Sequence, residues 1–252
     1  MSLQITTPVP ESTFGTGGPY DFFEPRAECY FALSEAFKEP TAEFARDVRT
    51  GQLHGLLKQC FEALGLLVDL AALRMKGDPE TILNHIKRGY YPLFVVPPDF
   101  VMPVESVYKE WRGEGGFLAG ARDMFMGPAA ADMRRRYRQR GLLLDVPRAL
   151  KDFPDHLALL LEYGGLLCRE EDGLELADFV CTHFDEWIES FGSQVLARSR
   201  SPFYRTLTTA LMAFIQYERL STRTFPTQRT IFPDHLTCRE RLSGNPKGEH
   251  HA

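Results

Sequence analysis

Asp155 and His156 are the neighbouring side chains best suited to acid–base chemistry in this sequence. A carboxylate beside an imidazole could help to activate a serine or cysteine nucleophile, as in a small helical hydrolase. However, no GxSxG segment and no metal-ligating constellation accompanies the pair. Two interpretations therefore stay open, a hydrolase built on Asp155 and His156, and a structural histidine that hydrogen-bonds a neighbouring loop.

A dense basic run is the second feature with chemical potential. Its five arginines are Arg134, Arg135, Arg136, Arg138 and Arg140. Such a run could bind the phosphate of a nucleotide or pterin, but neither GxxxxGK(S/T) nor GxGxxG occurs in the chain. A solvated helix face is the simpler interpretation, and we predict no cofactor site.

Composition and charge restrict the class of protein. The 252 residues are 44% hydrophobic with a net charge of −5, which suits a globular protein with a substantial core. The negative charge argues against a general nucleic-acid binder and leaves room for a basic peptide as partner. No stretch reaches about 18 apolar residues, and residues 1–20 do not resemble a secretory signal. We expect a cytoplasmic protein without stable membrane insertion.

The cysteines indicate the same compartment. They are odd in number and form no CxxC or zinc-type spacing: Cys29, Cys60, Cys168, Cys181 and Cys238. We therefore expect buried reduced thiols and no metal site.

Residues 152–168, DFPDHLALLLEYGGLLC, form the most apolar stretch and should be the central helix. Asp152 could cap this helix, with Pro154 in its first turn. Only His156 and Glu162 are ionisable between residues 156 and 168, so most faces of the helix should be buried. Gly164 and Gly165 predict close packing against another backbone.

Helical periodicity accounts for most of the remaining chain, and strand patterns are nearly absent. We expect an all-α, compact multi-helix bundle in a single domain. The expected helices cover residues 24–38, 41–51, 53–76, 79–90, 105–111, 128–141, 174–191 and 194–220. Three prolines make residues 95–103 a stiff loop. Residues 1–20 should be a flexible arm, 21–220 the helical domain and 221–252 a tail.

Residues 142–153 are a candidate hinge between the N- and C-terminal helical parts. If the helices that follow this segment exchange between chains, every core contact is preserved, so we expect monomer and domain-swapped dimer to coexist.

Two motifs in order resemble one known family. Residues 152–163, DFPDHLALLLEY, resemble the (E/D)xPDH(L/I)…LE(F/Y) signature of the TorD/DmsD/NarJ family. Residues 90–95, YYPLFV, and 103–108, PVESVY, resemble its YxxLFVGP…P(Y)ESVY segment. The likeness covers roughly residues 25–220, but Val96 and Pro98 replace the usual glycines, so the loop after Phe94 is expected to differ in shape.

This resemblance implies a function. The family consists of cytoplasmic chaperones that bind the N-terminal, twin-arginine-type leader of a molybdopterin oxidoreductase catalytic subunit and assist its maturation, cofactor insertion and export control. It implies no catalysis, and it assigns leader binding to a set of motif residues: Asp155, His156, Tyr91, Phe94, Glu105, Ser106 and Tyr108. Read from the residues alone, the aromatic members could equally be core and Ser106 a helix cap, and the protein could be a non-catalytic helical scaffold.

Overall fold

The computed structural model describes residues 23–96, 100–109, 125–144, 150, 152–185 and 187–222. Its helical elements, in chain order, are α1 (Phe23–Phe37), α2 (Ala42–Thr50), α3 (Gln52–Ala63), the 3₁₀ turn η2 (Ala71–Leu73), α4 (Pro79–Phe94), α5 (Glu105–Tyr108), α6 (Pro128–Gln139), α8 (Leu157–Arg169), α9 (Gly173–His183), α10 (Trp187–Arg198) and α11 (Pro202–Thr222). No strand occurs in these ranges, and an isolated antiparallel bridge joins Val104 and His156. The expected all-α fold is confirmed.

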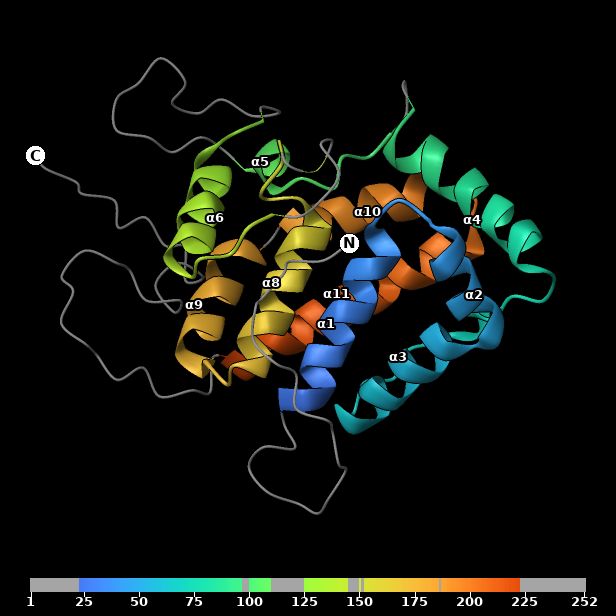
Figure 1. Ribbon diagram of the computed structural model, residues 1–252, viewed down its shortest axis with the longest axis horizontal. Helices are drawn as coiled ribbons and strands as arrows, with labels where there is room; N and C mark the ends of the chain where they lie inside the picture. The colour runs from blue at the N-terminus through green and yellow to red at the C-terminus, as the bar shows by residue number, and fades with distance from the viewer. Residues whose placement is uncertain are drawn as a thin grey trace, which may run out of the picture.

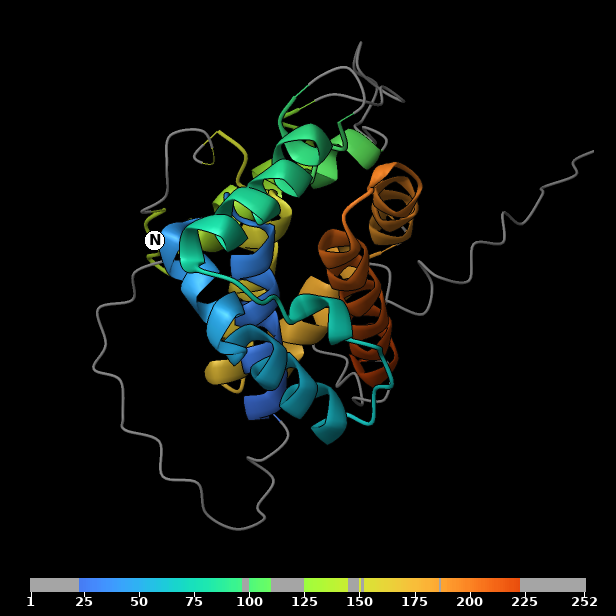
Figure 2. The same cartoon turned by 90° about the vertical axis from the view of Figure 1, so that its right-hand side faces the viewer.

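The central helix is α8, which lies alongside α1 in the middle of the molecule, with α11 behind the pair (Figure 1). Figure 2 shows α10 and α11 together on one side of this core. Every residue of α8 from Leu157 to Cys168 is buried. This burial confirms that the most apolar stretch of the sequence is the core helix.

Local signals in the sequence begin and end several helices. The Thr41 hydroxyl accepts a hydrogen bond from the Phe44 amide at 3.1 Å and caps α2, while Gly51 closes it with a φ of 78°. Asp78 caps α4 in the same way, and Pro79 occupies its first turn. These short-range interactions fix where the helices begin and end.

The predicted start of the central helix is wrong. The helix begins at Leu157 with His156 as its cap, and Asp152 lies in a turn ahead of it. The cause is tertiary, because the backbone of residues 155–157 pairs with the segment that precedes α5 and is therefore not free to coil.

Four other predicted helices are shorter than expected or interrupted. Residues 53–76 do not form one helix, since α3 ends at Ala63, and Gly65, with a φ of 68°, reverses the chain. The predicted helix 174–191 ends early, because α9 ends at His183. The predicted helix 194–220 is interrupted at residues 199–201, and Pro202 begins α11. Helix α5 ends at Tyr108, and residues 110–111 of its predicted span lie outside the described part.

Glycines bring α8 close to α1, as predicted, but against aromatic rings and not against backbone. A Cβ on Gly164 would stand 2.7 Å from the Tyr30 ring, and one on Gly165 would stand 2.8 Å from the Phe31 ring. The side chains of α1 therefore fill the space that the two glycines leave.

Parts of the predicted domain organisation lie outside the described residues. They include the arm, nearly all of the tail and the middle of the candidate hinge. At the hinge, Leu142 and Leu144 pack against the core. Its role stays a prediction.

Candidate functional site

The two family-like motifs meet at one place in the fold. The Glu105 amide donates to the Asp155 carbonyl at 3.1 Å, and the Leu157 amide donates to the Pro103 carbonyl at 2.8 Å. Together with the Val104–His156 bridge, these bonds join residues 103–106 to residues 155–157. We call these two segments the motif junction. It connects the loop before α5 to the start of the core helix.

Side chains reinforce the backbone pairing of the motif junction. One carboxylate oxygen of Asp155, Oδ2, accepts bonds from the Ser106 amide at 2.8 Å and from the Ser106 hydroxyl at 2.5 Å. The Ser106 Oγ in turn accepts the Gly127 amide at 3.1 Å. Burial raises the pKa of Asp155, against the lowering effect of the bonds from Ser106. The buried Asp155 and Ser106 side chains therefore join the two motifs, and through Gly127 they also bind the residue that precedes α6.

His156 is the cap of the core helix. Its Nδ1 accepts the Ala158 amide at 3.2 Å, so this ring nitrogen is unprotonated. Burial, followed by the nearby positive charge of Lys38, lowers the pKa of His156 to about 4. The imidazole is therefore neutral near pH 7.

The geometry of His156 does not support the hydrolase interpretation. The Ser106 hydroxyl is bonded to Asp155, and its bonding partners do not include His156. The serine, histidine and carboxylate are therefore not linked in the order that nucleophile activation requires.

A buried ionic chain adjoins the motif junction. His183, at the end of α9, contacts Glu105 Oε2 through Nδ1 at 2.7 Å and Asp132 Oδ2 through Nε2 at 3.0 Å. Lys109 pairs with the other oxygen of Glu105, and Arg136 donates to Asp132 at 2.7 Å. This chain of alternating charges ties α5 to α6 and α9.

Along this chain, the effect of ion pairing on the pKa values is larger than the opposing effect of burial. Burial by itself would lower the pKa of His183, but Glu105 and Asp132 raise it. Burial would raise the pKa of Glu105, but His183 and Lys109 lower it. The chain is therefore held in its charged form.

Sequence reasoning missed His183, Asp132 and Lys109. Two local signals were available, because Glu105 precedes Lys109 and Asp132 precedes Arg136 by four residues, the spacing of a helical ion pair. His183 had no local signal, since both of its partners are distant in the sequence.

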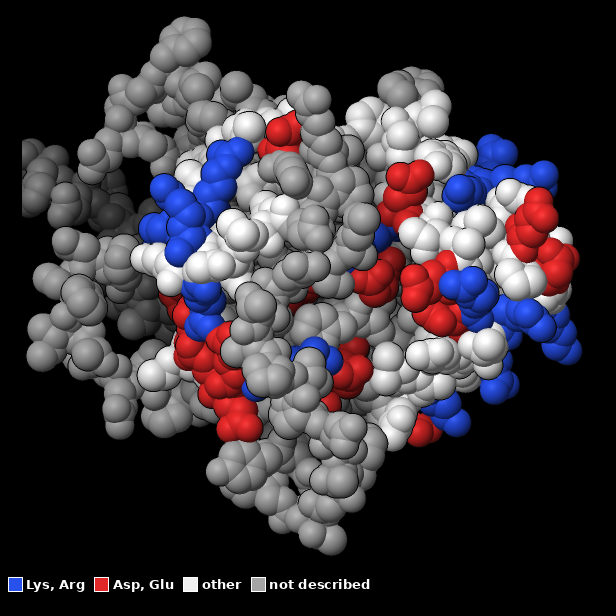
Figure 3. Space-filling model, viewed as in Figure 1, with Lys and Arg blue, Asp and Glu red and all other residues white. Residues whose placement is uncertain are grey.

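The arginine run is only partly a solvated face. Arg136 is buried and pairs with Asp178 at 2.5 Å, and Arg140 reaches Asp172 at 2.7 Å and Glu175 at 2.5 Å on and beside α9. Figure 3 shows basic side chains over α6 next to acidic side chains over the end of the molecule where α9 lies. Two of the five arginines therefore bind α6 to α9.

The three aromatic candidates have different environments. Phe94 is buried among Phe37, Phe191 and Tyr204 and belongs to the core. Tyr108 is half-buried, with its ring 5.5 Å from that of Trp187. Tyr91 is half-buried and donates to the exposed Glu39 at 2.5 Å.

The seven candidate residues therefore form two groups. Asp155, His156, Glu105 and Ser106 come together in the buried motif junction. Of the aromatic candidates, only Tyr91 and Tyr108 are partly exposed.

The described ranges carry neither a metal-ligand cluster nor a membrane-spanning helix. These residues contain no cluster of three or more histidine, cysteine or acidic side chains that could hold a metal ion. None of their helices has the length and apolarity needed to cross a bilayer.

The cysteine expectation is confirmed in part. Cys29, Cys60 and Cys168 are free and buried, and burial raises the pKa of each thiol. Cys181, in contrast, is half-buried and disulfide-bonded, so the expectation of reduced thiols is wrong for it. Cys238 lies outside the described residues.

Comparisons with known proteins were made over the full sequence. The profile of the nitrate reductase delta subunit family matches residues 33–193. The chaperone protein TorD of Shewanella sp. (strain MR-4) is 35% identical over 69 residues, which are 26% of this chain and 32% of TorD. The match thus spans about a third of the length of that curated relative.

One solved structure is similar as well. It is named for a redox enzyme maturation protein of Archaeoglobus fulgidus, with a TM-score of 0.44 and 19% identity, covering 81% of this chain and 99% of that one.

Proposed function

The chain belongs to the nitrate reductase delta subunit family, and we propose that it is a cytoplasmic chaperone for the maturation of a molybdenum-containing oxidoreductase. It would bind the N-terminal, twin-arginine-type leader of the catalytic subunit and hold the apoenzyme until its cofactor is inserted. For an exported client, the same binding would delay export.

The motif junction carries this proposal. The family match includes both motifs, and residues 103–106 and 155–157 are hydrogen-bonded to each other. Residues that are distant in sequence but joined in one buried cluster are suited to hold a neighbouring surface in a fixed shape. The surface that adjoins the end of α4 and the following loop is therefore our proposed leader site.

The candidate residues would act in two ways. Tyr91 and Tyr108 are partly exposed and could contact the leader directly. Asp155, His156, Glu105, Ser106 and Phe94 are buried and would position that surface.

An exposed carboxylate beside Tyr91 could pair with an arginine of the leader. Glu39 accepts the Tyr91 hydroxyl at 2.5 Å and is itself exposed. A guanidinium could pair with the carboxylate while the apolar part of the leader packs against the tyrosine ring.

The second candidate function, hydrolysis by Asp155 and His156, has less support. A histidine with a pKa of about 4 and an Nδ1 occupied by a backbone amide is poorly suited to remove a proton from Ser106 near pH 7. Family membership likewise favours a non-catalytic chaperone.

Protease protection of a leader peptide tests the proposal. The peptide carries two adjacent arginines before an apolar segment, and its control carries two lysines, which cannot form the same bidentate bonds. We expect the protein to slow tryptic cleavage of the arginine peptide at least several-fold more than that of the lysine peptide, without turnover of a phosphate or acyl ester. Equal cleavage with and without protein, or ester turnover that is lost in His156→Ala, would refute the proposal.

A further inference from the structure

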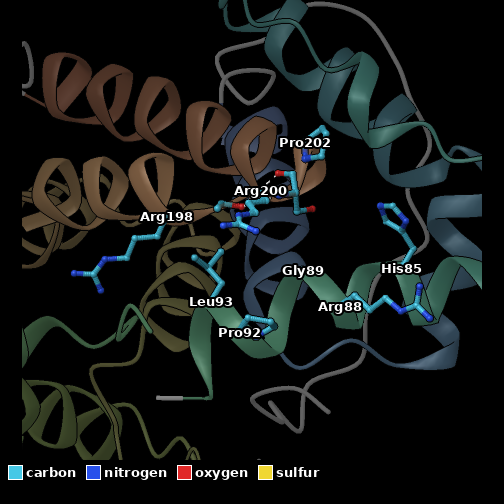
Figure 4. Close-up of a pocket in the computed structure, with 10 residues that line it drawn as sticks. His85, Arg88, Gly89, Pro92, Leu93, Arg198, Arg200 and Pro202 are labelled. Atoms are coloured by element: carbon cyan, nitrogen blue, oxygen red, sulfur yellow. Dashed lines mark hydrogen bonds between the residues drawn. The ribbon is translucent and has the colours of Figure 1, made fainter. Parts of the chain in front are cut away.

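A basic cavity separate from the candidate leader residues lies between α4 and the connection from α10 to α11. Its volume is about 590 Å³, within the size range of small-molecule sites. Figure 4 shows Arg200 in the middle of the view, His85 and Arg88 on one side of it and Arg198 on the other. These basic groups come from two segments that are more than 100 residues apart.

The described residues that line this cavity carry positive charge and no negative charge. No aspartate or glutamate is among the described residues that line it. Arg88 and Arg200 are exposed and form no ion pair with any part of the chain that the structure describes. Arg198 is tethered, because it donates to the Phe100 carbonyl at 2.9 Å.

The start of a long helix forms part of the wall. The Ser201 carbonyl accepts the Arg205 amide at 3.1 Å, so Ser201 is the residue that precedes α11, a helix of 21 residues. Its positive end faces the same region as the arginines, and such helix ends favour anions.

A polar atom of this wall also lacks a partner. Among the described residues, the Ser201 hydroxyl oxygen is shielded from solvent and makes no hydrogen bond. Gly89 allows this close approach of α4, because a Cβ at that position would stand 2.9 Å from Ser201 Oγ. Ser201 is therefore packed tightly against α4 at the wall of the cavity.

We propose that this cavity binds a small molecule that carries two or more phosphate groups. Guanidinium groups form paired hydrogen bonds with phosphate oxygens, and the positive end of α11 favours the same charge. The arginines are distributed along the cavity and do not converge on one point, so an elongated anion fits them better than a single phosphate. The inference goes beyond the proposed leader binding and uses none of its residues.

Calorimetric titration with tripolyphosphate tests this site. We expect binding to wild type that weakens at least tenfold when Arg88→Ala and Arg200→Ala are combined. The matched control is Arg49→Ala, which removes an exposed arginine of α2 that forms no ion pair in the described structure and does not line the cavity. Its affinity should stay within twofold of wild type. Unchanged circular dichroism would establish that the variants are folded.

The choice of anions makes the test decisive. Orthophosphate should bind at least tenfold more weakly than tripolyphosphate, while adenosine triphosphate binding more tightly than tripolyphosphate would identify a nucleotide as the source. Equal affinity for the two would support inorganic polyphosphate. The proposal is overturned by absence of binding to wild type, by an equal loss in Arg49→Ala, or by a polyglutamate peptide that binds as tightly as tripolyphosphate.

Discussion

His156 illustrates how a residue that suggests catalysis is used for structure. Its Nδ1 satisfies one of the amides that every helix start leaves unpaired, and burial keeps the ring neutral. Its neighbour Asp155 binds Ser106 in the other family-like motif. The two neighbours therefore have different structural roles: His156 caps the core helix, and Asp155 binds Ser106 across the motif junction.

The lowered pKa of His156 predicts acid sensitivity. The unfolded chain binds a proton near pH 6.5, whereas the folded chain resists it down to about pH 4, so this group's contribution to stability is present above pH 6.5 and declines as the pH falls. His156→Asn keeps an oxygen acceptor for the cap but does not titrate. We expect the free energy of unfolding of wild type to fall, relative to this variant, by on the order of 3 kcal/mol between pH 7 and pH 4.

Urea unfolding at several pH values checks this difference. The contribution of His183 to stability has the opposite pH dependence. Because the pKa of His183 is raised in the folded protein, its stabilisation is complete at low pH and is lost as the pH rises through the folded pKa. Since His183 is present in both proteins, its effect cancels. Parallel curves for His156→Asn and wild type would contradict the assignment.

At the scale of elements, α1 links the core helix to α11. Arg26 binds the Glu218 carboxylate through Nε at 2.7 Å and Nη2 at 2.8 Å, and the Tyr30 hydroxyl donates to it at 2.9 Å. All three residues are fully buried. Tyr30 also contacts the surface of α8 at Gly164, so the spacing between α1 and α8 controls a buried ionic group on α11.

Gly164→Ala should therefore destabilise the protein. The added methyl would push against the Tyr30 ring and displace its hydroxyl from Glu218, at a cost of about 1–3 kcal/mol that outweighs the gain in helix propensity. Gly55→Ala is the matched control, because it lies inside α3 with nothing within 4 Å of the new Cβ. We expect thermal unfolding to show a lower Tm for Gly164→Ala and an equal or higher Tm for Gly55→Ala. The same change in both variants would contradict the packing explanation.

Periodicity and capping predicted the elements well where local forces decide. The all-α class and the buried core helix follow from local residue patterns. The sequence did not predict the start of α8 at Leu157, because a long-range backbone bridge decides it. It also overestimated the helices at 53–76, 174–191 and 194–220, where apolar spacing continues across a positive-φ glycine and across short turns.

The same distinction explains the candidate site. The motifs selected seven residues by their sequence pattern, and the structure brings Asp155 of one motif into contact with Ser106 of the other. Their role in leader binding stays a prediction. Burial and long-range pairing could not be read from the motifs. His183 shows this most clearly, since its partners Glu105 and Asp132 lie 78 and 51 residues away.

At the scale of the whole molecule, the motif junction connects the two halves that the candidate hinge would separate. The segment before α5 belongs to the first half, and α8 begins the second. A domain-swapped dimer would have to reform these bonds between chains, and coexistence with the monomer stays a prediction. The proposed leader surface adjoins this boundary, so leader binding and the arrangement of the halves should influence each other.

Isothermal titration of the arginine-pair leader peptide tests the central claim most directly. The variants are Tyr91→Phe and Glu39→Gln at the exposed pair, His156→Asn at the junction, and Glu43→Gln as a control at an exposed carboxylate of α2. We expect wild type and Glu43→Gln to bind equally. The Tyr91 and Glu39 variants should bind about tenfold more weakly, a loss of about 1.4 kcal/mol, with an unchanged Tm.

Stability measured in parallel separates recognition from folding. His156→Asn should change the pH dependence of unfolding with little direct effect on affinity at neutral pH, because the side chain is buried. Weaker binding confined to Tyr91→Phe and Glu39→Gln is the result that the chaperone account predicts. A wild-type protein that does not bind the peptide, or affinities that are the same in wild type, Tyr91→Phe and Glu39→Gln, would contradict it.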